Sequence, residues 1–482
     1  MAPRNDLLDY PMLGLSETDV LLFRDFIEGG TLITGALGSG KSSTSGRTIA
    51  YAFLRAGLGG LVLTVKSDET QHWIDYAREC GREQDLIIFN AESNLSFDPI
   101  AYSWYQSGRG SGSLETIIEL FSTLLSVGKQ YGASSGEKYF EQAVEELMRT
   151  VLVMQSLAAE QISITSIHSI ITSLPGDVAQ IEDIAWQSSP CGKLITRLRE
   201  RKTTFSPSQW ADLDNAVLFA MKKWPELDPR TRGNIESTWS GMASKFLYDP
   251  FRRMFSSGGV SFTPEQTTHE HKIVIVDMPV LEVGRAASQL CQVMVKIIFQ
   301  RAWLRHQYVP GCCNGAFLFQ DEFSLLMHRH ENHFHQVCRG SAIAAVCLTP
   351  NILNIASEEF GEEKPGSKTL GFLGNLSIKI FHQQNDIETC NYAADQIGKE
   401  YRYVDSYNAG GDQHNTHASI SGAKQLTHIL EPIELTRLEK PNGKSPYSAA
   451  IVYCGGRSFN ATKTEREPNG RNYLRVLFSR ET

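Results

Sequence analysis

Short apolar runs alternate with stretches of helical periodicity near the start of this chain. The runs GTLIT (30–34), GLVLTV (60–65) and LIIFN (86–90) are separated by helical patterns at about 41–55 and 69–80. Runs of this length, bounded by polar or glycine-rich residues, predict buried strands. Strands that alternate with helices predict a parallel, doubly wound α/β sheet.

The same alternation returns in the second half of the chain, with a long helical pattern around 284–306. The predicted strands there are HKIVIVDMP (271–279), GAFLFQDE (315–322), AIAAVCLT (342–349), LSIKIFHQ (376–383), and the runs PYSAAIVYCGG and NYLRVLFS near the end. Between them and the first strands the periodicity is helical, which predicts an all-α insertion. We therefore expect a core in two parts, residues 1–102 and 256–482, around an all-α domain at 103–255. The polar, glycine-rich segment 404–425 predicts a mobile loop.

Composition and charge narrow the class of protein. The chain has 482 residues, of which 41% are hydrophobic and 21% charged, as in an ordinary globular protein. Its net charge of −8 argues against a generally basic nucleic-acid binder, but not against a local basic channel. Nine scattered cysteines favour a reducing compartment. With no signal-peptide pattern and no apolar stretch near the ~18 residues of a membrane span, the sequence predicts a cytoplasmic protein without a span.

The segment GALGSGKSS, at 35–43, directly follows a predicted strand and opens a predicted helix. It contains the complete pattern G-x-x-x-x-G-K-[ST], whose glycines let backbone N–H groups surround a phosphate. Lys41 can reach the β- and γ-phosphates of a nucleotide, and the Ser42 hydroxyl can bind Mg²⁺. We therefore predict ATP and Mg²⁺ as cofactors. The expected cofactor-binding residues are Gly35, Gly38, Ser39, Gly40, Lys41, Ser42 and Ser43.

An acidic pair stands at the end of another predicted strand. In AFLFQDEF, Asp321 would hold the metal through water and Glu322 would orient the attacking water. Asp277, at the end of IVIVD, is the alternative metal residue, but it has no Glu beside it and is interpreted as a cap of the following turn. The sequence thus predicts Ser42 and Asp321 at the metal, with Lys41 and Glu322 as catalytic residues.

Longer segments accompany these motifs. They are TRGNIESTWSGMASKFLYDP after the helical stretch, KIVIVDMPV, GNLSIKIFHQQNDIETCNYAADQIGK and the closing NYLRVLFSR. In this combination the chain resembles the FtsK–HerA superfamily of ring-forming, DNA-pumping P-loop ATPases, and within it the type IV secretion coupling proteins of the TraG/TraD kind. The resemblance implies a RecA-like core with an inserted all-α domain, a hexameric ring, ATP bound between neighbouring subunits, and DNA in a central pore.

The resemblance also implies an arginine that completes the site of the adjacent subunit, and Arg339 in CRGSAIAAVCLTPN fits that position. The family ends the next strand with a Gln that senses the γ-phosphate, whereas this chain has Pro350 there. Thr349 or Asn351 could substitute for the missing amide. Pro350 therefore predicts altered coupling between hydrolysis and motion.

The function expected from these features is ATP-driven DNA translocation, for a secretion channel or for a partner effector in prokaryotic antiviral defence. The absence of a membrane anchor favours the second use. The alternative is a nucleotide-gated assembly scaffold that hydrolyses ATP slowly and binds a protein partner. DNA contacts are expected from polar loops, with Lys424, Arg109, Lys129 and Lys138 as candidates, although each loop is more simply interpreted as a solvated surface.

Four histidines and a cysteine lie close together in MHRHENHFHQVC (327–338). These residue types suit a metal ion, but their spacing matches no zinc motif. We interpret the segment as a polar turn and helix that face solvent or a subunit interface.

Overall fold

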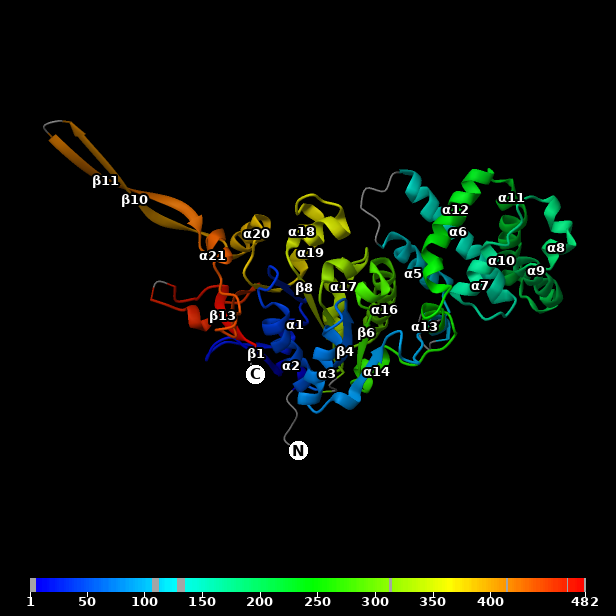
Figure 1. Ribbon diagram of the computed structural model, residues 1–482, viewed down its shortest axis with the longest axis horizontal. Coiled ribbons are helices and arrows are strands. Elements are labelled where there is room, and N and C mark those ends of the chain that lie inside the picture. Colours follow the sequence, from blue (N-terminus) through cyan, green and yellow to red (C-terminus); the bar gives the residue numbers. More distant parts are fainter. Residues whose placement is uncertain are drawn as a thin grey trace.

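A nine-stranded sheet forms the centre of the molecule (Figure 1). The computed structural model describes residues 6–105, 112–127, 135–311, 314–412, 415–465 and 467–480. Across the sheet the strands are β13 (Tyr473–Ser479), β12 (Tyr447–Cys454), β9 (Ile378–Phe381), β3 (Thr31–Thr34), β8 (Ile343–Thr349), β7 (Ala316–Gln320), β4 (Gly59–Thr64), β6 (Ile273–Asp277) and β5 (Leu86–Phe89). All strands from β9 to β5 are parallel, and β12 is antiparallel to both β9 and β13. The predicted α/β class with a mostly parallel sheet is confirmed.

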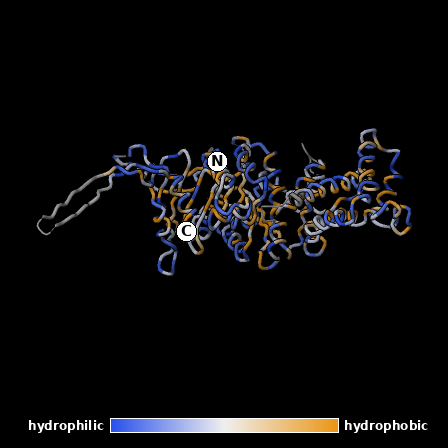
Figure 2. The backbone as a smooth tube through the Cα atoms, turned by 90° about the horizontal axis from the view of Figure 1, so that it is seen from above, coloured by the Kyte–Doolittle hydropathy of each residue, from blue (hydrophilic) through white to orange (hydrophobic). Residues whose placement is uncertain are grey.

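Alternate residues of the parallel strands enter cores on opposite faces of the sheet. In β4, Leu61 and Leu63 pack into one core and Val62 into the other. In β6, Val274 packs into the first core and Ile273 into the second. A parallel strand covered on both faces is apolar throughout, which explains why these strands appear in the sequence as continuous hydrophobic runs. Figure 2 shows apolar residues gathered in the interior of the sheet region and polar residues on its outer loops.

Helices cover both faces of the sheet. On the face of Val62 lie α1 (Phe23–Phe26), α2 (Arg47–Arg55) and α3 (Glu69–Glu79). On the opposite face, over β4, β6 and β7, lie α4 (Pro99–Tyr105) and the long helix α16 (Arg285–Arg305). The same face carries, over β3, β9 and β12, the helices α18 (Ile352–Ile355), α19 (Ser367–Asn375), α20 (Ile387–Ile397) and α21 (Pro432–Thr436). Short helices α14 (Glu265–His269), α15 (Val280–Val283) and α17 (Glu331–Val337) complete the core region.

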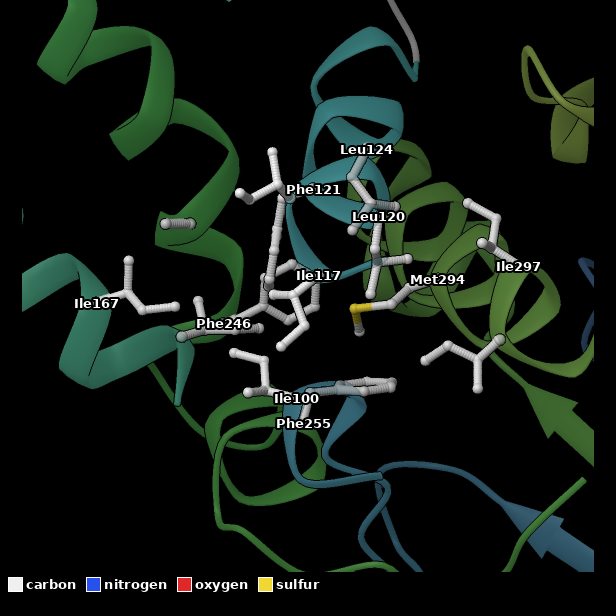
Figure 3. Packing of buried hydrophobic residues seen from close by; sticks show 14 of the residues in the cluster. Ile100, Ile117, Leu120, Phe121, Leu124, Ile167, Phe246, Phe255, Met294 and Ile297 are labelled. Carbon is white, nitrogen blue, oxygen red and sulfur yellow. The ribbon is translucent and has the colours of Figure 1, made fainter. Parts of the chain in front are cut away.

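A block of helices joins β5 to β6 and occupies one end of the molecule (Figure 1). Its members are α5 (Leu114–Ser126), α6 (Ser135–Leu157), α7 (Ile164–Ile171), α8 (Ile184–Gln187), α9 (Pro190–Arg201), α10 (Pro207–Leu218), α11 (Trp224–Glu226), α12 (Pro229–Ala243) and α13 (Phe251–Phe255). Figure 3 shows Ile117, Leu120 and Leu124 of α5 facing Met294 and Ile297 of α16, so the block shares a buried cluster with the sheet. The exact domain boundaries stay a prediction.

The segment expected to be a mobile loop forms a β-hairpin instead. Strands β10 (Lys399–Asp412) and β11 (Asn415–His428) pair antiparallel along their whole length and project away from the sheet, at the end opposite the helical block (Figure 1). The prediction of a loop at 404–425 is therefore wrong. A ribbon that stands apart from the main sheet needs no apolar face, so the hydropathy pattern carried no strand signal.

Two further observations complete the description. A small hairpin of β1 (Pro11–Gly14) and β2 (Val20–Leu22), which the sequence did not predict, precedes the core. Among the described residues, no helix has the length and apolar content needed to cross a bilayer.

Candidate nucleotide-binding site

The predicted phosphate loop joins β3 to a helical turn, Ser42–Gly46, that continues into α2. Its first residue is tied to β8, because Gly35 N–H donates to the Pro350 carbonyl (3.2 Å). Its second is tied to the end of β9, because Ala36 N–H donates to the Gln383 carbonyl (2.8 Å). The loop is therefore anchored at the carboxyl ends of both strands that flank β3, the edge where parallel α/β sheets bind ligands.

Glycine is required at two positions of the loop for different reasons. A Cβ on Gly35 would lie 2.2 Å from Ser39 Oγ and 2.8 Å from His382 Cβ, so no side chain fits. Gly40 has φ +94°, in the region that favours glycine, and its missing Cβ leaves room for Ser448. Close approach and positive φ together let the loop curl around an anion.

The charge and the polar groups of the loop suit phosphate. Lys41 is buried, with 7% of its surface exposed, and has no ion-pair partner in the part of the chain that the structure describes. Ser39 Oγ is buried without a hydrogen-bond partner. A buried ammonium with no carboxylate in direct contact is costly, and the phosphates of a bound anionic ligand would supply that contact. Because the helix that follows points its N-terminus at the same place, these residues fit the phosphates of ATP.

The predicted metal residues are in contact. Ser42 Oγ donates to Asp321 Oδ2 at 2.8 Å, although 279 positions separate them in the sequence. A hydroxyl and a carboxylate are the hard oxygen donors that Mg²⁺ prefers, and Mg²⁺ commonly binds through few protein ligands beside nucleotide phosphates. The donor set therefore fits Mg²⁺, which when bound would neutralise phosphate charge.

Glu322 is held in an unusual backbone conformation beside this pair. It has φ 50° and ψ 44°, left-handed values that a non-glycine residue rarely adopts, and its N–H donates to Asp321 Oδ1 at 2.9 Å. Strain of this kind costs about 1–3 kcal/mol and concentrates at functional sites. The carboxylate of Glu322 is 20% exposed and so remains accessible to water.

Lys66, which follows β4, lies among the carboxylates. Its Nζ is 2.9 Å from Asp321 Oδ2, 3.1 Å from Glu322 Oε1 and 3.2 Å from Glu69 Oε1. Because β4 is the neighbour of β7 in the sheet, the residue after one strand meets the acidic pair after the other. Glu69 opens α3, and its second oxygen accepts a hydrogen bond from Val65 N–H.

The groups of this cluster differ in the direction in which their pKa values are shifted. Burial and the charge of Asp321 raise the pKa of Glu69 well above its ordinary value. Burial alone would also raise the pKa of Asp321, but the hydrogen bond with Glu69 and the charges of Lys66 and Lys41 outweigh it and lower the pKa. The three carboxylates likewise outweigh the effect of burial on Lys66 and raise its pKa. Asp321, beside Ser42, is therefore the stronger acid of this pair, and Glu69 is the weaker one.

A buried histidine fixes the back of the phosphate loop. Ser448, at the start of β12, donates its hydroxyl to the Ser39 carbonyl (2.7 Å), so towards His382 Nδ1 (2.9 Å) its oxygen can only accept. His382 Nδ1 therefore carries the proton, and Nε2 accepts from the Ser45 hydroxyl (2.7 Å). Burial and the charge of Lys41 lower the pKa of His382 to about 3, which keeps the ring neutral.

A cavity of about 640 Å³ opens in front of these groups. It extends from the phosphate loop along α3, where His72, Trp73 and Tyr76 line it, and Arg480 borders it from the end of β13. Arg480 Nε lies 3.3 Å from Ser43 Oγ. The volume is within the range of small-molecule sites, about 300–1,000 Å³.

The other predicted residues lie apart from this cavity. Arg339 is 72% exposed and has its guanidinium 3.6 Å from a carboxylate oxygen of Glu28. It precedes β8, whereas the phosphate loop meets the other end of that strand, about 20 Å away at ~3.3 Å per residue. Asp277 ends β6, two strands beyond β7, and accepts a hydrogen bond from Asn90. Arg339 thus does not reach the site of its own subunit, and Asp277 is too remote to replace Asp321.

The residues around Pro350 are engaged in local structure. The Thr349 hydroxyl donates to the Asn351 carbonyl (3.1 Å), and the Asn351 side chain accepts from Asn354 N–H (2.8 Å) as the N-cap of α18. The Thr349 hydroxyl and the Asn351 side-chain oxygen thus both serve local structure.

The histidine segment differs from its interpretation as a solvent-facing turn. Glu331 is buried, with its carboxylate 2.6 Å from Lys296 Nζ, 3.1 Å from His328 Nε2 and 3.3 Å from His335 Nε2. Gln300 adds a hydrogen bond to the same carboxylate. Among the described residues, no group of three or more His, Cys, Asp or Glu is arranged to hold a metal ion. Of the four histidines, His328 and His335 face inward and contact the buried carboxylate of Glu331. His330 is partly exposed and His333 is exposed, as the interpretation expected.

The candidate DNA-contacting residues are only partly described. Lys424 lies on β11 with its ammonium 5.0 Å from the ring centre of Tyr401. Arg109, Lys129 and the side chain of Lys138 lie outside the described residues.

Sequence reasoning missed four residues that contact the site, namely Lys66, Glu69, His382 and Ser448. A signal in the sequence could have revealed two of them, because Lys66 follows one predicted strand of the parallel sheet and His382 lies near the end of another. The carboxyl ends of such strands meet at one edge.

Known proteins resemble the chain in sequence and in fold. The family described as "TraM recognition site of TraD and TraG" matches residues 318–440. No curated protein matches the sequence. Among solved structures, the bacterial conjugative coupling protein TrwBdeltaN70 in its unbound form is 12% identical, covers 99% of this chain and 98% of its own, and gives a TM-score of 0.56.

Two related structures agree. TrwBdeltaN70 in complex with sulphate is 12% identical, with 98% and 91% of the two chains covered and a TM-score of 0.60. The plasmid coupling protein TrwB in complex with the non-hydrolysable ATP analogue ADPNP is 12% identical, with 98% and 92% covered and a TM-score of 0.58. These likenesses confirm the RecA-like P-loop fold with a helical domain. Residues 318–440 are therefore similar to the family of TraD and TraG, and the chain as a whole shares the fold of the TrwB coupling proteins.

Proposed function

We propose that this protein is an ATP-hydrolysing motor that assembles into a ring and moves DNA. The observation that carries the proposal is the contact between Ser42 and Asp321 beside the buried Lys41, which makes no ion pair within the described part of the chain. In this arrangement Lys41 binds the β- and γ-phosphates, Ser42 and Asp321 hold Mg²⁺, and Glu322 orients the attacking water. Gly35, Gly38, Ser39, Gly40 and Ser43 form the phosphate cradle with them.

The exposure of Arg339 supports a shared site. An arginine that neutralises phosphate charge in a neighbouring subunit must project from the surface, and Arg339 does so with only one weak ion pair. The homo-oligomer is expected to be a hexamer, with DNA in its pore and phosphate contacts that do not depend on sequence. The relatives named as conjugative coupling proteins favour DNA transfer through a secretion channel over service to an antiviral effector. In this proposal the motor acts in the cytoplasm, and its protein partner is a channel component or an effector.

Turnover of ATP with and without DNA tests this function. Wild-type protein should be stimulated severalfold by DNA, and Lys41→Ala and Glu322→Gln should each lose about 100-fold or more in turnover. Glu322→Gln should still bind ATP, because it retains the cradle, whereas Lys41→Ala should bind it weakly. A Glu322→Gln protein that hydrolyses ATP like wild type would contradict the assignment.

Mixing inactive variants tests the shared site. Arg339→Ala and Lys41→Ala subunits should each be inactive alone and should regain part of the activity when mixed, because some sites then combine an intact Lys41 with an intact neighbouring Arg339. Arg24→Ala is the matched control, since Arg24 is also an exposed arginine paired with a carboxylate, Asp9. Light scattering and electron microscopy would count the subunits. Mixtures that stay inactive would refute a role for Arg339 in trans.

A second function has one specific observation in its favour. Position 350, at the end of β8, has a carbonyl but no side-chain amide, and the Thr349 hydroxyl and the Asn351 side-chain oxygen are engaged in local hydrogen bonds. A nucleotide-gated scaffold that binds a protein partner and hydrolyses ATP slowly would not need a γ-phosphate sensor. Such a scaffold would assemble when nucleotide is added, and its turnover would be indifferent to DNA.

A further inference from the structure

Lys66 forms ion pairs with two carboxylates that have different roles in the proposed reaction. Asp321 is assigned to the metal and Glu322 to the attacking water. Its ammonium is 2.9 Å from Asp321 Oδ2 and 3.1 Å from Glu322 Oε1, so one cation ties both side chains together. Asp321 Oδ2 is also the atom that accepts from Ser42. The ammonium therefore contacts the same oxygen that faces the predicted Mg²⁺ ligand.

The pairing also fixes the direction of Glu322. The left-handed backbone of Glu322 and its N–H bond to Asp321 set where the side chain begins, and Lys66 sets where it ends. A carboxylate whose oxygen accepts from an ammonium has fewer oxygen lone pairs left for water.

We propose that Lys66 is a positioning residue that restrains Glu322, holding its carboxylate against Asp321 until the ammonium is displaced. This inference rests on the proposed ATPase function and deepens it, because it names a residue that sets the resting rate. Nothing in the predicted motifs assigns a role to Lys66.

The exposure of Lys66 makes such displacement feasible. Its side chain is 42% exposed, so the ammonium can exchange its carboxylate partners for water. Lys296, a lysine on helix α16, provides a contrast. Lys296 and Glu331 are 0% and 1% exposed, and a pair buried so completely has no water with which to exchange. Of these two ion-paired lysines, Lys66 is therefore the one whose ammonium can move away from its partners.

The position of Lys66 further links Glu322 to the wall of the cavity. Lys66 and Glu69 form the turn that opens α3, and the same helix lines the cavity through Trp73 and Tyr76. A ligand or subunit that shifts α3 would therefore move the ammonium that holds Glu322.

Substitution of Lys66 in the full-length protein tests the restraint in two independent ways. In Lys66→Met the carboxylates lose their cation, so in the absence of nucleotide the unfolding temperature should fall, and millimolar Mg²⁺ should restore it more than an equal ionic strength of NaCl. Wild type and Lys66→Arg should show no such selective rescue. Lys272→Met is the matched control, because Lys272 is another partly exposed lysine and its ion pair, with Asp85, lies outside the site.

The second readout is the rate. Without DNA, Lys66→Met should hydrolyse ATP about three- to fivefold faster than wild type, the range expected when a partly exposed ion pair no longer opposes the reactive arrangement. Lys66→Arg should stay within about twofold of wild type, since it retains the pairing.

The two readouts separate the possible failures. Loss of Mg²⁺ rescue in Lys66→Met would show that Lys66 is not the counter-ion of these carboxylates and would overturn the proposal. A rate below wild type, with the protein folded, would also overturn it, because Lys66 would then serve the reaction instead of restraining it. If no form hydrolyses ATP, the proposed ATPase function fails, and the Mg²⁺ rescue still decides whether Lys66 pairs with Asp321 and Glu322.

Discussion

Ser448→Ala should weaken nucleotide binding, although Ser448 does not belong to the phosphate loop. Its hydroxyl connects two buried groups, as the donor to the Ser39 carbonyl at 2.7 Å and the acceptor from His382 Nδ1 at 2.9 Å. The substitution removes a single oxygen and leaves almost no cavity. Its effect therefore comes from hydrogen bonding and not from packing.

The magnitude follows from the groups left without partners. An unsatisfied buried donor or acceptor costs about 1–3 kcal/mol, and Ser448→Ala creates one of each, so the expected loss is about 2–6 kcal/mol. The Ser39 carbonyl can escape part of this cost if the loop rearranges in the free protein. Binding must then restore the loop, and affinity falls tenfold for each ~1.4 kcal/mol that restoration requires. We expect an affinity for nucleotide about 10- to 30-fold weaker.

Calorimetric titration with a non-hydrolysable ATP analogue measures this effect, and thermal unfolding measures the accompanying loss of stability. Ser445→Ala is the control, because the Ser445 hydroxyl only accepts a 3.4 Å bond from Tyr447 N–H in the turn before β12. A double variant with His382→Ala should cost less than the sum of the single changes, since both remove the same bond. If Ser448→Ala kept wild-type affinity and stability, the role given to the hydrogen bonds of the Ser448 hydroxyl would be refuted.

Three further substitutions have defined outcomes. Glu331→Gln leaves the buried ammonium of Lys296 without a charge partner and should cost about 3–5 kcal/mol in thermal unfolding, with recovery when Lys296→Met is added; a stable single variant would contradict the buried pair. Burial lowers the pKa of Lys379 from 10.5 to about 8, so charging it opposes folding below pH 8. Lys379→Met should therefore stabilise the protein at pH 7 by up to about 3 kcal/mol. Because the wild type recovers stability as the pH rises from about 8 to 10.5, the difference should vanish across that window, and a constant difference would argue against titration of Lys379. Asn351→Ala should cost about 1 kcal/mol as a lost helix cap, with Asn351→Asp near wild type and nucleotide binding unchanged in both, whereas weaker binding would show that Asn351 serves the site.

Local patterns in the sequence were sufficient for the strands and for the phosphate loop. The strands of the parallel sheet are buried on both faces, so each is a continuous apolar run that can be recognised without its neighbours. The loop depends on glycines and a lysine within nine residues, 35–43, and its geometry is set locally. The acidic pair could be predicted because Asp321 and Glu322 end such a run.

The order of the strands could not be predicted in this way, and the missed residues depend on it. Lys66 reaches Asp321 only because β4 lies beside β7, and His382 reaches Ser45 only because β9 lies beside β3. These pairings join segments hundreds of positions apart, for which hydropathy gives no register. The two inward histidines were missed for a related reason, since their partner Glu331 is buried by pairing with Lys296, which comes from the distant helix α16.

Strand order also changes what Pro350 implies. The expectation of a sensing glutamine assumed that the end of β8 presents a side chain to the nucleotide, but here the Pro350 carbonyl is the group in use, and it accepts from Gly35 N–H. An amide is nevertheless present at this point, from the other side. Gln384, just beyond β9, can accept from Gly35 N–H at 3.1 Å and donate to the Pro350 carbonyl at 3.3 Å. Proline at 350 is thus compatible with an anchored phosphate loop. The bond from the end of β8 uses a backbone carbonyl, which proline retains, and the bonds from beyond β9 come from other residues. If ATP hydrolysis is slow, the restraint on Glu322 by Lys66 is a more direct physical cause than the residue at 350.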